Sequence, residues 1–256
     1  MPPNRLRQIW SEGRGALNGW CSIGCAFTAE AMARQGWDSV TIDVQHGLIG
    51  YAEMLGMLQA ISATEAVPIV RVPWNQPGDL MKALDAGALG IICPMINSRA
   101  ECEAFVRACR YPPEGFRSYG PTRAAIAYGA DYAGAANREV VVLAMIETAE
   151  GLANLEEIVT TPGLDGIYVG PSDLSLALGG PPDQDSQDPM RLEAFDRILS
   201  ACQARGLKVG VHTTSPAYSK QMLERGFDLV TVGADVRYLA AGRREVAEMR
   251  QWQKGR

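Results

Sequence analysis

The chain has 256 residues, of which 47% are hydrophobic and 21% are charged, enough for one large domain with a sizeable buried core. Lys and Arg number 24 against 29 Asp and Glu, which gives a formal charge of −5 and a pI near 5.2. This acidic balance lacks the basic surface of a general nucleic-acid binder, so we expect no nucleic-acid partner.

The N-terminal segment and the cysteines favour a cytoplasmic protein. The first 15 residues contain no apolar signal-peptide core, and the longest strongly apolar run, residues 140–146, is too short to span a bilayer. The six cysteines form no C-x-x-C pair and are too few for a disulfide scaffold, so we expect reduced, packed thiols. We therefore predict no contact with a membrane.

Short apolar, β-branched segments alternate with helical patterns along almost the whole chain, which is typical of βαβ units in a parallel sheet. Eight segments are predicted to be strands, namely residues 16–21, 39–44, 68–72, 90–94, 141–147, 166–170, 207–212 and 229–233. Apolar residues at helical spacing predict helices over residues 28–35, 51–63, 77–86, 99–110, 151–159, 189–205, 216–225 and 236–253.

Several of these helices are followed by a glycine that can take the left-handed conformation and close the helix, as at Gly36, Gly87, Gly206 and Gly226. The eight units follow one another without a linker, and no G-x-G-x-x-G follows the first strand. The sequence therefore predicts an α/β fold, a single (β/α)8 TIM barrel over residues 1–256, rather than a doubly wound sheet.

Residues 111–139 break this rhythm, because the segment is long and has little apolar periodicity. Long loops inside compact domains are usually functional or disordered. This one contains Arg117 and Arg123. We interpret it as an ordered loop that covers the site.

The carboxyl ends of the strands carry the chemistry in barrels of this type, and here they are unusually polar. Arg71 lies in a strand that a parallel sheet should bury on both faces, so its guanidinium needs an anionic partner. A structural ion pair inside the barrel is the alternative to a functional role.

Two carboxylates are expected to meet at the same opening. Strand alternation places Glu147 at the mouth above a column of apolar residues, and Asp173 follows the next strand. Taken alone, Asp173 or Ser172 reads as a helix N-cap. Taken together, two oxygen ligands suit Mg²⁺ or Mn²⁺, with Co²⁺ as a further candidate, which keep waters and accept other ligands from the substrate.

The two histidines of the chain, His46 and His212, both fall at strand ends. Asp43 stands three residues before His46, near enough for its carboxylate to orient the imidazole. Helix capping by these residues is the plainer alternative. No lysine occurs at a carboxyl strand end, which argues against a Schiff-base mechanism and favours carbonyl chemistry that uses a metal.

At these positions the chain resembles the HpcH/HpaI aldolases, metal-dependent pyruvate aldolases of the phosphoenolpyruvate/pyruvate barrel superfamily. The likeness runs almost end to end and rests on five segments: Asp43-Val-Gln-His46, Val70-Arg-Val-Pro73-Trp-Asn75, Arg110-Tyr-Pro-Pro-Glu-Gly-Phe-Arg117, Ile146-Glu147-Thr and Val169-Gly-Pro-Ser-Asp-Leu-Ser175. Two departures bear on aldehyde preference, because many members have Glu in place of Gln45 and an apolar residue in place of His212.

The resemblance implies a role for each site residue. Glu147 and Asp173 would bind the divalent ion, Arg71 would contact the keto oxygen of pyruvate, and His46 with Asp43 would serve as the base. Backbone amides of Ser172 and Asp173 would hold the substrate carboxylate. It also implies a homo-hexamer, a trimer of dimers, with the last helix exchanged between neighbouring subunits.

The sequence thus predicts a class II aldolase that joins pyruvate or hydroxypyruvate to an aldehyde, giving 4-hydroxy-2-oxo acids, and cleaves them in reverse. His212 and Arg123 are expected to contact the substrate, with Arg123 or Arg117 reading the acceptor end from its own or a neighbouring subunit. The alternatives are a citramalyl-CoA-type lyase of the same superfamily and a non-catalytic metal-binding barrel. A phosphosugar barrel is disfavoured, because the turns after the last two predicted strands lack a glycine-rich phosphate cradle.

Overall fold

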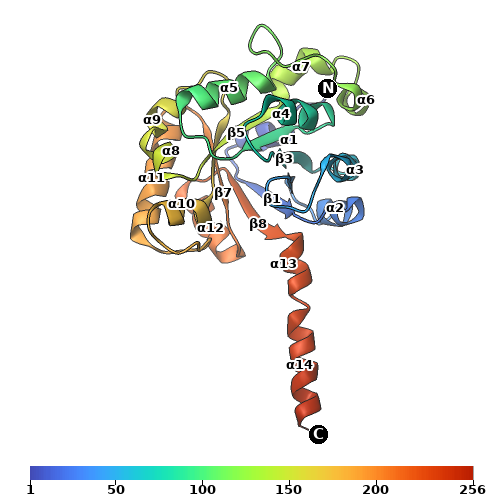
Figure 1. Ribbon diagram of the computed structural model, residues 1–256, viewed down its shortest axis with the longest axis vertical. Coiled ribbons are helices and arrows are strands. Elements are labelled where there is room, and N and C mark those ends of the chain that lie inside the picture. The colour runs from blue at the N-terminus through green and yellow to red at the C-terminus, as the bar shows by residue number, and fades with distance from the viewer. Residues whose placement is uncertain (256) are drawn as a thin grey trace.

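Eight parallel strands close into a barrel in which each strand pairs with its neighbours in sequence and β8 pairs with β1 (Figure 1). The computed structural model describes residues 1–255. The strands are β1 (Ala16–Cys21), β2 (Ser39–Asp43), β3 (Val67–Arg71), β4 (Gly90–Cys93), β5 (Val141–Ile146), β6 (Gly166–Val169), β7 (Lys208–His212) and β8 (Leu229–Ala234). Every boundary lies within one residue of the sequence prediction, and the (β/α)8 barrel is confirmed.

Helices surround the barrel, and the last two extend away from it at the C-terminal end (Figure 1). They are α1 (Arg5–Ser11), α2 (Ala26–Ala33), α3 (Tyr51–Ile61), α4 (Pro77–Asp85), α5 (Arg99–Cys109), α6 (Thr122–Tyr128), α7 (Tyr132–Glu139), α8 (Ala149–Ala153), α9 (Leu155–Ile158), α10 (Pro171–Ala177), α11 (Pro189–Gln203), α12 (Pro216–Arg225), α13 (Asp235–Ala240) and α14 (Arg243–Lys254). Among the described residues, no helix is long and apolar enough to cross a bilayer.

Helix α1, which the periodicity of the sequence did not predict, closes the end of the barrel where the strands begin. Its buried side chains Leu6, Ile9 and Trp10 belong to the same cluster as the side chains that fill the barrel interior. Asn4 caps the helix by accepting from the backbone N–H of Leu6, and its own amide donates to the carbonyls of Leu89 and Glu139. The substrate mouth must therefore lie at the opposite end.

Shortening the side chain of Leu6 should destabilise this closed end. Leu6 is fully buried, so we expect Leu6→Ala to lower the free energy of unfolding by about 2–5 kcal/mol through lost burial and a cavity. Urea titration measures this, and Gln8→Ala on the exposed side of the same helix is the control. Equal, small changes in both variants would mean that α1 does not pack into the barrel.

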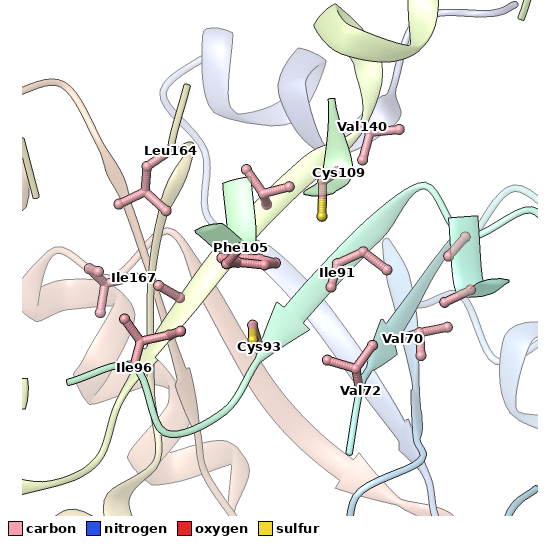
Figure 2. Close-up of a cluster of buried hydrophobic side chains, with 14 of the residues drawn as sticks. Val70, Val72, Ile91, Cys93, Ile96, Phe105, Cys109, Val140, Leu164 and Ile167 are labelled. Atoms are coloured by element: carbon pink, nitrogen blue, oxygen red, sulfur yellow. The ribbon is translucent and has the colours of Figure 1, made fainter. Parts of the chain in front are cut away.

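A second apolar layer lies between the strands and the surrounding helices. Figure 2 shows part of it, where Phe105 and Cys109 of α5 lie over Ile91 and Cys93 of β4. All four side chains are essentially inaccessible to solvent. Because strands in this layer are buried on both faces, they are held rigidly and fix the positions of the residues at their ends.

The prediction that residues 111–139 cover the site is wrong. The segment contains α6 and α7 and lies beside the N-terminus in Figure 1, away from the carboxyl ends of the strands. Arg123 donates to the carbonyl of Ala86 (2.6 Å) and to the hydroxyl of Ser62 (3.1 Å), at the ends of α4 and α3. Because the segment joins the end of a helix to the start of a strand, barrel topology places it at the end of the barrel that α1 closes, which we call the closed face.

Arg117 is held at the same closed face. Its guanidinium, whose side chain is inaccessible to solvent, donates to Asp85 at 2.6 Å and to the hydroxyl of Tyr132 at 3.1 Å. Arg123 therefore stabilises the last turn of α4, where carbonyl groups attract cations, and Arg117 links the end of α4 to the start of α7. Neither reaches the mouth of its own barrel.

Candidate active site

The register of the sheet builds the centre of the site. β2 pairs with β3 so that Asp43 lies directly beside Arg71 at the carboxyl ends of the two strands. Arg71 donates from Nε to Oδ1 of Asp43 at 2.9 Å and from Nη2 to Oδ2 at 2.6 Å, a bidentate ion pair that is almost fully buried. No described residue accepts from Nη1 of Arg71, so this side of the guanidinium is left for a ligand.

The carboxylate of Asp43 is held at the end of β2 by hydrogen bonds from several neighbouring residues. Burial by itself would raise the pKa of its carboxyl, but hydrogen bonds and the charge of Arg71 outweigh burial and hold the pKa below its ordinary value. The indole N–H of Trp20 donates to Oδ2 at 3.2 Å, and the backbone N–H groups of Gln45 and His46 donate to Oδ1 at 3.1 and 3.2 Å. The carboxylate is fully ionised and rigidly held.

The expected pairing of Asp43 with the imidazole of His46 is corrected by these contacts. Asp43 binds the backbone N–H of His46, whereas the ring is exposed and hydrogen-bonds to no described residue. The carboxylate orients the strand end and leaves the ring free over the cavity. The sequence shows the three-residue spacing, but it does not show which N–H group of the histidine the carboxylate will accept a hydrogen bond from.

Glu147 follows β5 and is buried beneath the mouth. One oxygen, Oε1, accepts the backbone N–H of Met95 at 2.8 Å. Burial raises the pKa of its carboxyl to about 7, and the negative charge of Asp173 adds to this shift. The other oxygen lies against Gly170, where a Cβ would come within 2.3 Å of Oε2, so a larger residue there would displace the carboxylate.

Asp173 and Ser172 lie in the first turn of α10, which begins directly after β6. Asp173 is exposed, and the backbone N–H groups of both residues lie where a helix has no internal acceptor. They therefore face the same opening as Glu147 with free donors and a free carboxylate. The predicted convergence of the two carboxylates on one cavity is seen in the structure.

One cavity of about 130 Å³ joins the predicted residues His46, Arg71, Glu147, Ser172, Asp173 and His212. A water takes about 30 Å³ in the liquid, so the space suits a small organic acid. Sequence reasoning missed the other polar and aromatic side chains that line it, namely Trp20, Tyr168 and Gln184. The two aromatic residues lie at inward positions near the ends of β1 and β6, a signal that strand alternation offers.

These carboxylates suit a divalent cation. Glu147 and Asp173 supply hard oxygen ligands. Burial, and after it the charge of Asp173, raises the pKa of Glu147, and a cation between the two carboxylates would favour the ionised form. Within residues 1–255, no group of three or more His, Cys, Asp and Glu side chains is arranged to hold a metal. A cation held here would therefore keep positions for water and substrate oxygens.

His212 ends β7 and packs edge-on against Trp20, with 4.9 Å between ring centroids. Burial lowers the pKa of its imidazole to about 4, and the charge of Arg71 adds to this shift. The ring is therefore neutral at pH 7 and can both donate and accept. No described residue takes a hydrogen bond from it, so these capacities face the cavity.

The lowered pKa of His212 predicts a specific loss of stability in acid. In the unfolded chain the imidazole of His212 binds a proton below its ordinary pKa of 6.5. In the folded chain it stays neutral down to about pH 4. Relative to His212→Gln, the wild type should lose up to about 3 kcal/mol of unfolding free energy between pH 7 and 4. Urea titrations at both pH values measure this, and parallel losses in the two proteins would contradict it.

Comparisons with known proteins agree with this geometry. Residues 20–241 match the family model described as HpcH/HpaI aldolase/citrate lyase. The chain is 43% identical over 243 residues to a hydroxypyruvate/pyruvate aldolase of Rhizorhabdus wittichii, covering 95% of this chain and 97% of the relative. It is 33% identical over 249 residues to a 4-hydroxy-2-oxo-heptane-1,7-dioate aldolase of Salmonella dublin, covering 95% and 93% of the two chains.

A solved structure shares the whole architecture. The HpcH/HpaI aldolase/citrate lyase family protein of Burkholderia cenocepacia J2315 superposes with a TM-score of 0.88 at 35% identity, covering 96% of this chain and 99% of the other. The resemblance that the sequence motifs indicate is confirmed.

Proposed function

The chain belongs to the HpcH/HpaI aldolase/citrate lyase family, and from this membership and the geometry of the mouth we propose the reaction that it catalyses. It is a carbon–carbon lyase of the class II pyruvate aldolase type. The enzyme adds pyruvate or hydroxypyruvate to an aldehyde, and it cleaves the resulting 4-hydroxy-2-oxo acid in the reverse direction. The observation that carries this proposal is that Arg71, held by its bidentate pair with Asp43, lines one small cavity together with the carboxylates of Glu147 and Asp173.

Glu147 and Asp173 would hold a divalent ion such as Mg²⁺, Mn²⁺ or Co²⁺, which would supply Lewis-acid activation of the oxygens of the 2-oxo acid. The free Nη1 of Arg71 donates to the keto oxygen, where negative charge develops when the C3 proton leaves. Backbone N–H groups of Ser172 and Asp173 receive the substrate carboxylate. These contacts fix the donor before any proton moves.

His46 is the base in this proposal, because its ring is exposed at the mouth while its backbone is fixed by Asp43. The ring takes the C3 proton and leaves an enolate whose oxygen faces Arg71. The enolate carbon then forms a bond to the carbonyl carbon of the aldehyde, and the new alkoxide takes the proton back from His46. In the cleavage direction His46 takes the proton of the C4 hydroxyl, and the bond between C3 and C4 breaks.

Cleavage of a set of 4-hydroxy-2-oxo acids tests the proposal. Pyruvate or hydroxypyruvate release, followed by a coupled dehydrogenase, is expected in the presence of Mg²⁺ or Mn²⁺. Synthesis from pyruvate and glycolaldehyde should give the matching product. The proposal would be contradicted if no compound of the set released either oxo acid. Cleavage of a hydroxyacyl-CoA thioester instead of these compounds would also contradict it.

We also propose a homo-hexamer, a trimer of dimers that exchange the C-terminal helix. Helix α14 buries none of its residues within its own chain, extends from the barrel in Figure 1, and carries exposed Val246 and Met249. Aspartate at both positions should lower the mass measured by light scattering, because charges disfavour a buried apolar contact. An unchanged mass would mean that this helix does not join subunits.

A further inference from the structure

The connection between α10 and α11 lies on the mouth side of the barrel, and its residues Asp183, Asp185, Ser186 and Gln187 hydrogen-bond to neighbouring elements. The guanidinium of Arg191, itself buried, donates to the carbonyl of Asp183. The hydroxyl of Tyr218 donates to the carbonyl of Ser186 at 2.8 Å. These bonds tie the connection to α11 and α12.

Asp185 fastens the same connection to the turn that follows His212. Its carboxylate accepts the backbone N–H and the hydroxyl of Thr214, at 2.7 and 2.8 Å, and the hydroxyl of Ser215 at 2.7 Å. Further along, the amides of Gln187 and Gln221 exchange hydrogen bonds at 2.8 and 3.2 Å. The connection is thus held against the rim of the cavity.

Gln184 is the exception within this fastened stretch. Its partly buried side chain lines the cavity that holds Asp173 and His212, and no described residue hydrogen-bonds to its amide. Bonds at the positions on either side, Asp183 and Asp185, fix the backbone that presents it. A free amide offers both donors and an acceptor to a ligand.

The charge distribution of the cavity indicates what this amide meets. Arg71 is the one Lys or Arg side chain among the described residues that line the cavity, and it is engaged by Asp43. The lining also offers the amide of Gln184 and the imidazole of His212, neither of which carries a positive charge at pH 7. These uncharged groups can hydrogen-bond a hydroxyl group on the aldehyde. A carboxylate on the aldehyde would find no free cation to pair with.

We propose that Gln184 determines acceptor specificity by hydrogen-bonding the hydroxyl group of the aldehyde, so that the enzyme prefers small hydroxyaldehydes to unsubstituted aldehydes and to aldehydes that carry a carboxylate. This inference rests on the proposed aldolase function. Asp185 and Arg191 are positioning residues, because they act on the acceptor only through the segment that presents Gln184.

Gln184→Met keeps the side-chain length and removes the amide. We expect kcat/KM for glycolaldehyde, with pyruvate as donor, to fall about tenfold, and kcat/KM for acetaldehyde to stay within about twofold. Gln187→Met, three residues away, is a control, because Gln187 is bound to Gln221 and does not line the cavity; it should leave the ratio of the two aldehydes unchanged. Asp185→Ala should raise KM for glycolaldehyde more than it lowers kcat.

Exchange of the C3 protons of pyruvate into D₂O, measured by NMR without any aldehyde, separates this inference from the aldolase proposal. All three variants should exchange at the wild-type rate, because the donor site is intact. Absence of exchange in the wild type would overturn the aldolase function itself. Two results with normal exchange would overturn the role of Gln184. One is an equal loss of kcat/KM for both aldehydes in Gln184→Met, and the other is a preference of the wild type for succinic semialdehyde.

Discussion

Replacing Arg71 by alanine is expected to lower kcat/KM for aldol cleavage by a factor of about 10³. The variant removes the guanidinium that faces the keto oxygen and also leaves Asp43, which is 2% exposed, as a buried carboxylate without its cation. Breaking such a pair should lower the free energy of unfolding by about 3–5 kcal/mol. Steady-state kinetics and urea unfolding on the same preparation measure the two losses separately.

Two further variants separate catalysis from folding. Arg71→Lys keeps the charge but cannot form the bidentate pair, so we expect it to recover more stability than activity. Arg225→Ala breaks a pair of the same bidentate geometry with Asp196, at the surface and far from the mouth, and should keep wild-type kinetics. Near-native turnover in Arg71→Ala would make the Arg71–Asp43 pair structural.

Glu147→Gln should change activity and stability in opposite directions. The amide keeps an oxygen for the backbone N–H of Met95 but is a poor ligand for a divalent ion, so we expect kcat to fall at least about 100-fold. Burial raises the pKa of Glu147 to about 7, which means that the folded chain disfavours the ionised form. Removing that buried charge should raise the melting temperature of the metal-free protein, and addition of Mn²⁺ should no longer raise it further.

Glu139→Gln provides a control with another buried carboxylate. Glu139 accepts the backbone N–H of Asn4 at 2.8 Å and pairs with Arg138, at the closed face of the barrel. Its replacement should lower the melting temperature without changing kcat or the response to Mn²⁺. A response to Mn²⁺ that is the same in Glu147→Gln and in the wild type would contradict the assignment of Glu147 as a metal ligand.

The strands and the residues at their ends are predictable from the sequence for a physical reason. A parallel strand buried on both faces needs a continuous apolar run, so Arg71 and Glu147 stand out at the positions where those runs meet polar residues. Parallel pairing then brings all carboxyl ends to one rim, which is why residues far apart in the sequence share one cavity. The pairing of Arg71 with Asp43 additionally requires the register, which no single strand reveals.

The segments that escaped prediction lack such a periodic signal. Helix α6 is short, and the burial of Arg117 depends on Asp85 and Tyr132, which local pattern does not connect. Connectivity would have placed residues 111–139 correctly, since a connection from helix to strand always returns to the closed face. Gln184 lies on the mouth side within a run of polar residues, 183–188, that has no periodicity, so the sequence does not distinguish it from its neighbours; only the structure shows that its side chain lines the cavity.

Proton exchange at C3 of pyruvate tests the central claim most directly, because it requires the donor site and no aldehyde. In D₂O the wild type with Mg²⁺ or Mn²⁺ should exchange these protons, thorough chelation should stop the exchange, and added metal should restore it. Borohydride should trap no pyruvate on the chain, since no lysine is among the described residues that line the cavity. Exchange that survives chelation, or a covalent adduct after borohydride, would contradict a metal-dependent enolate mechanism.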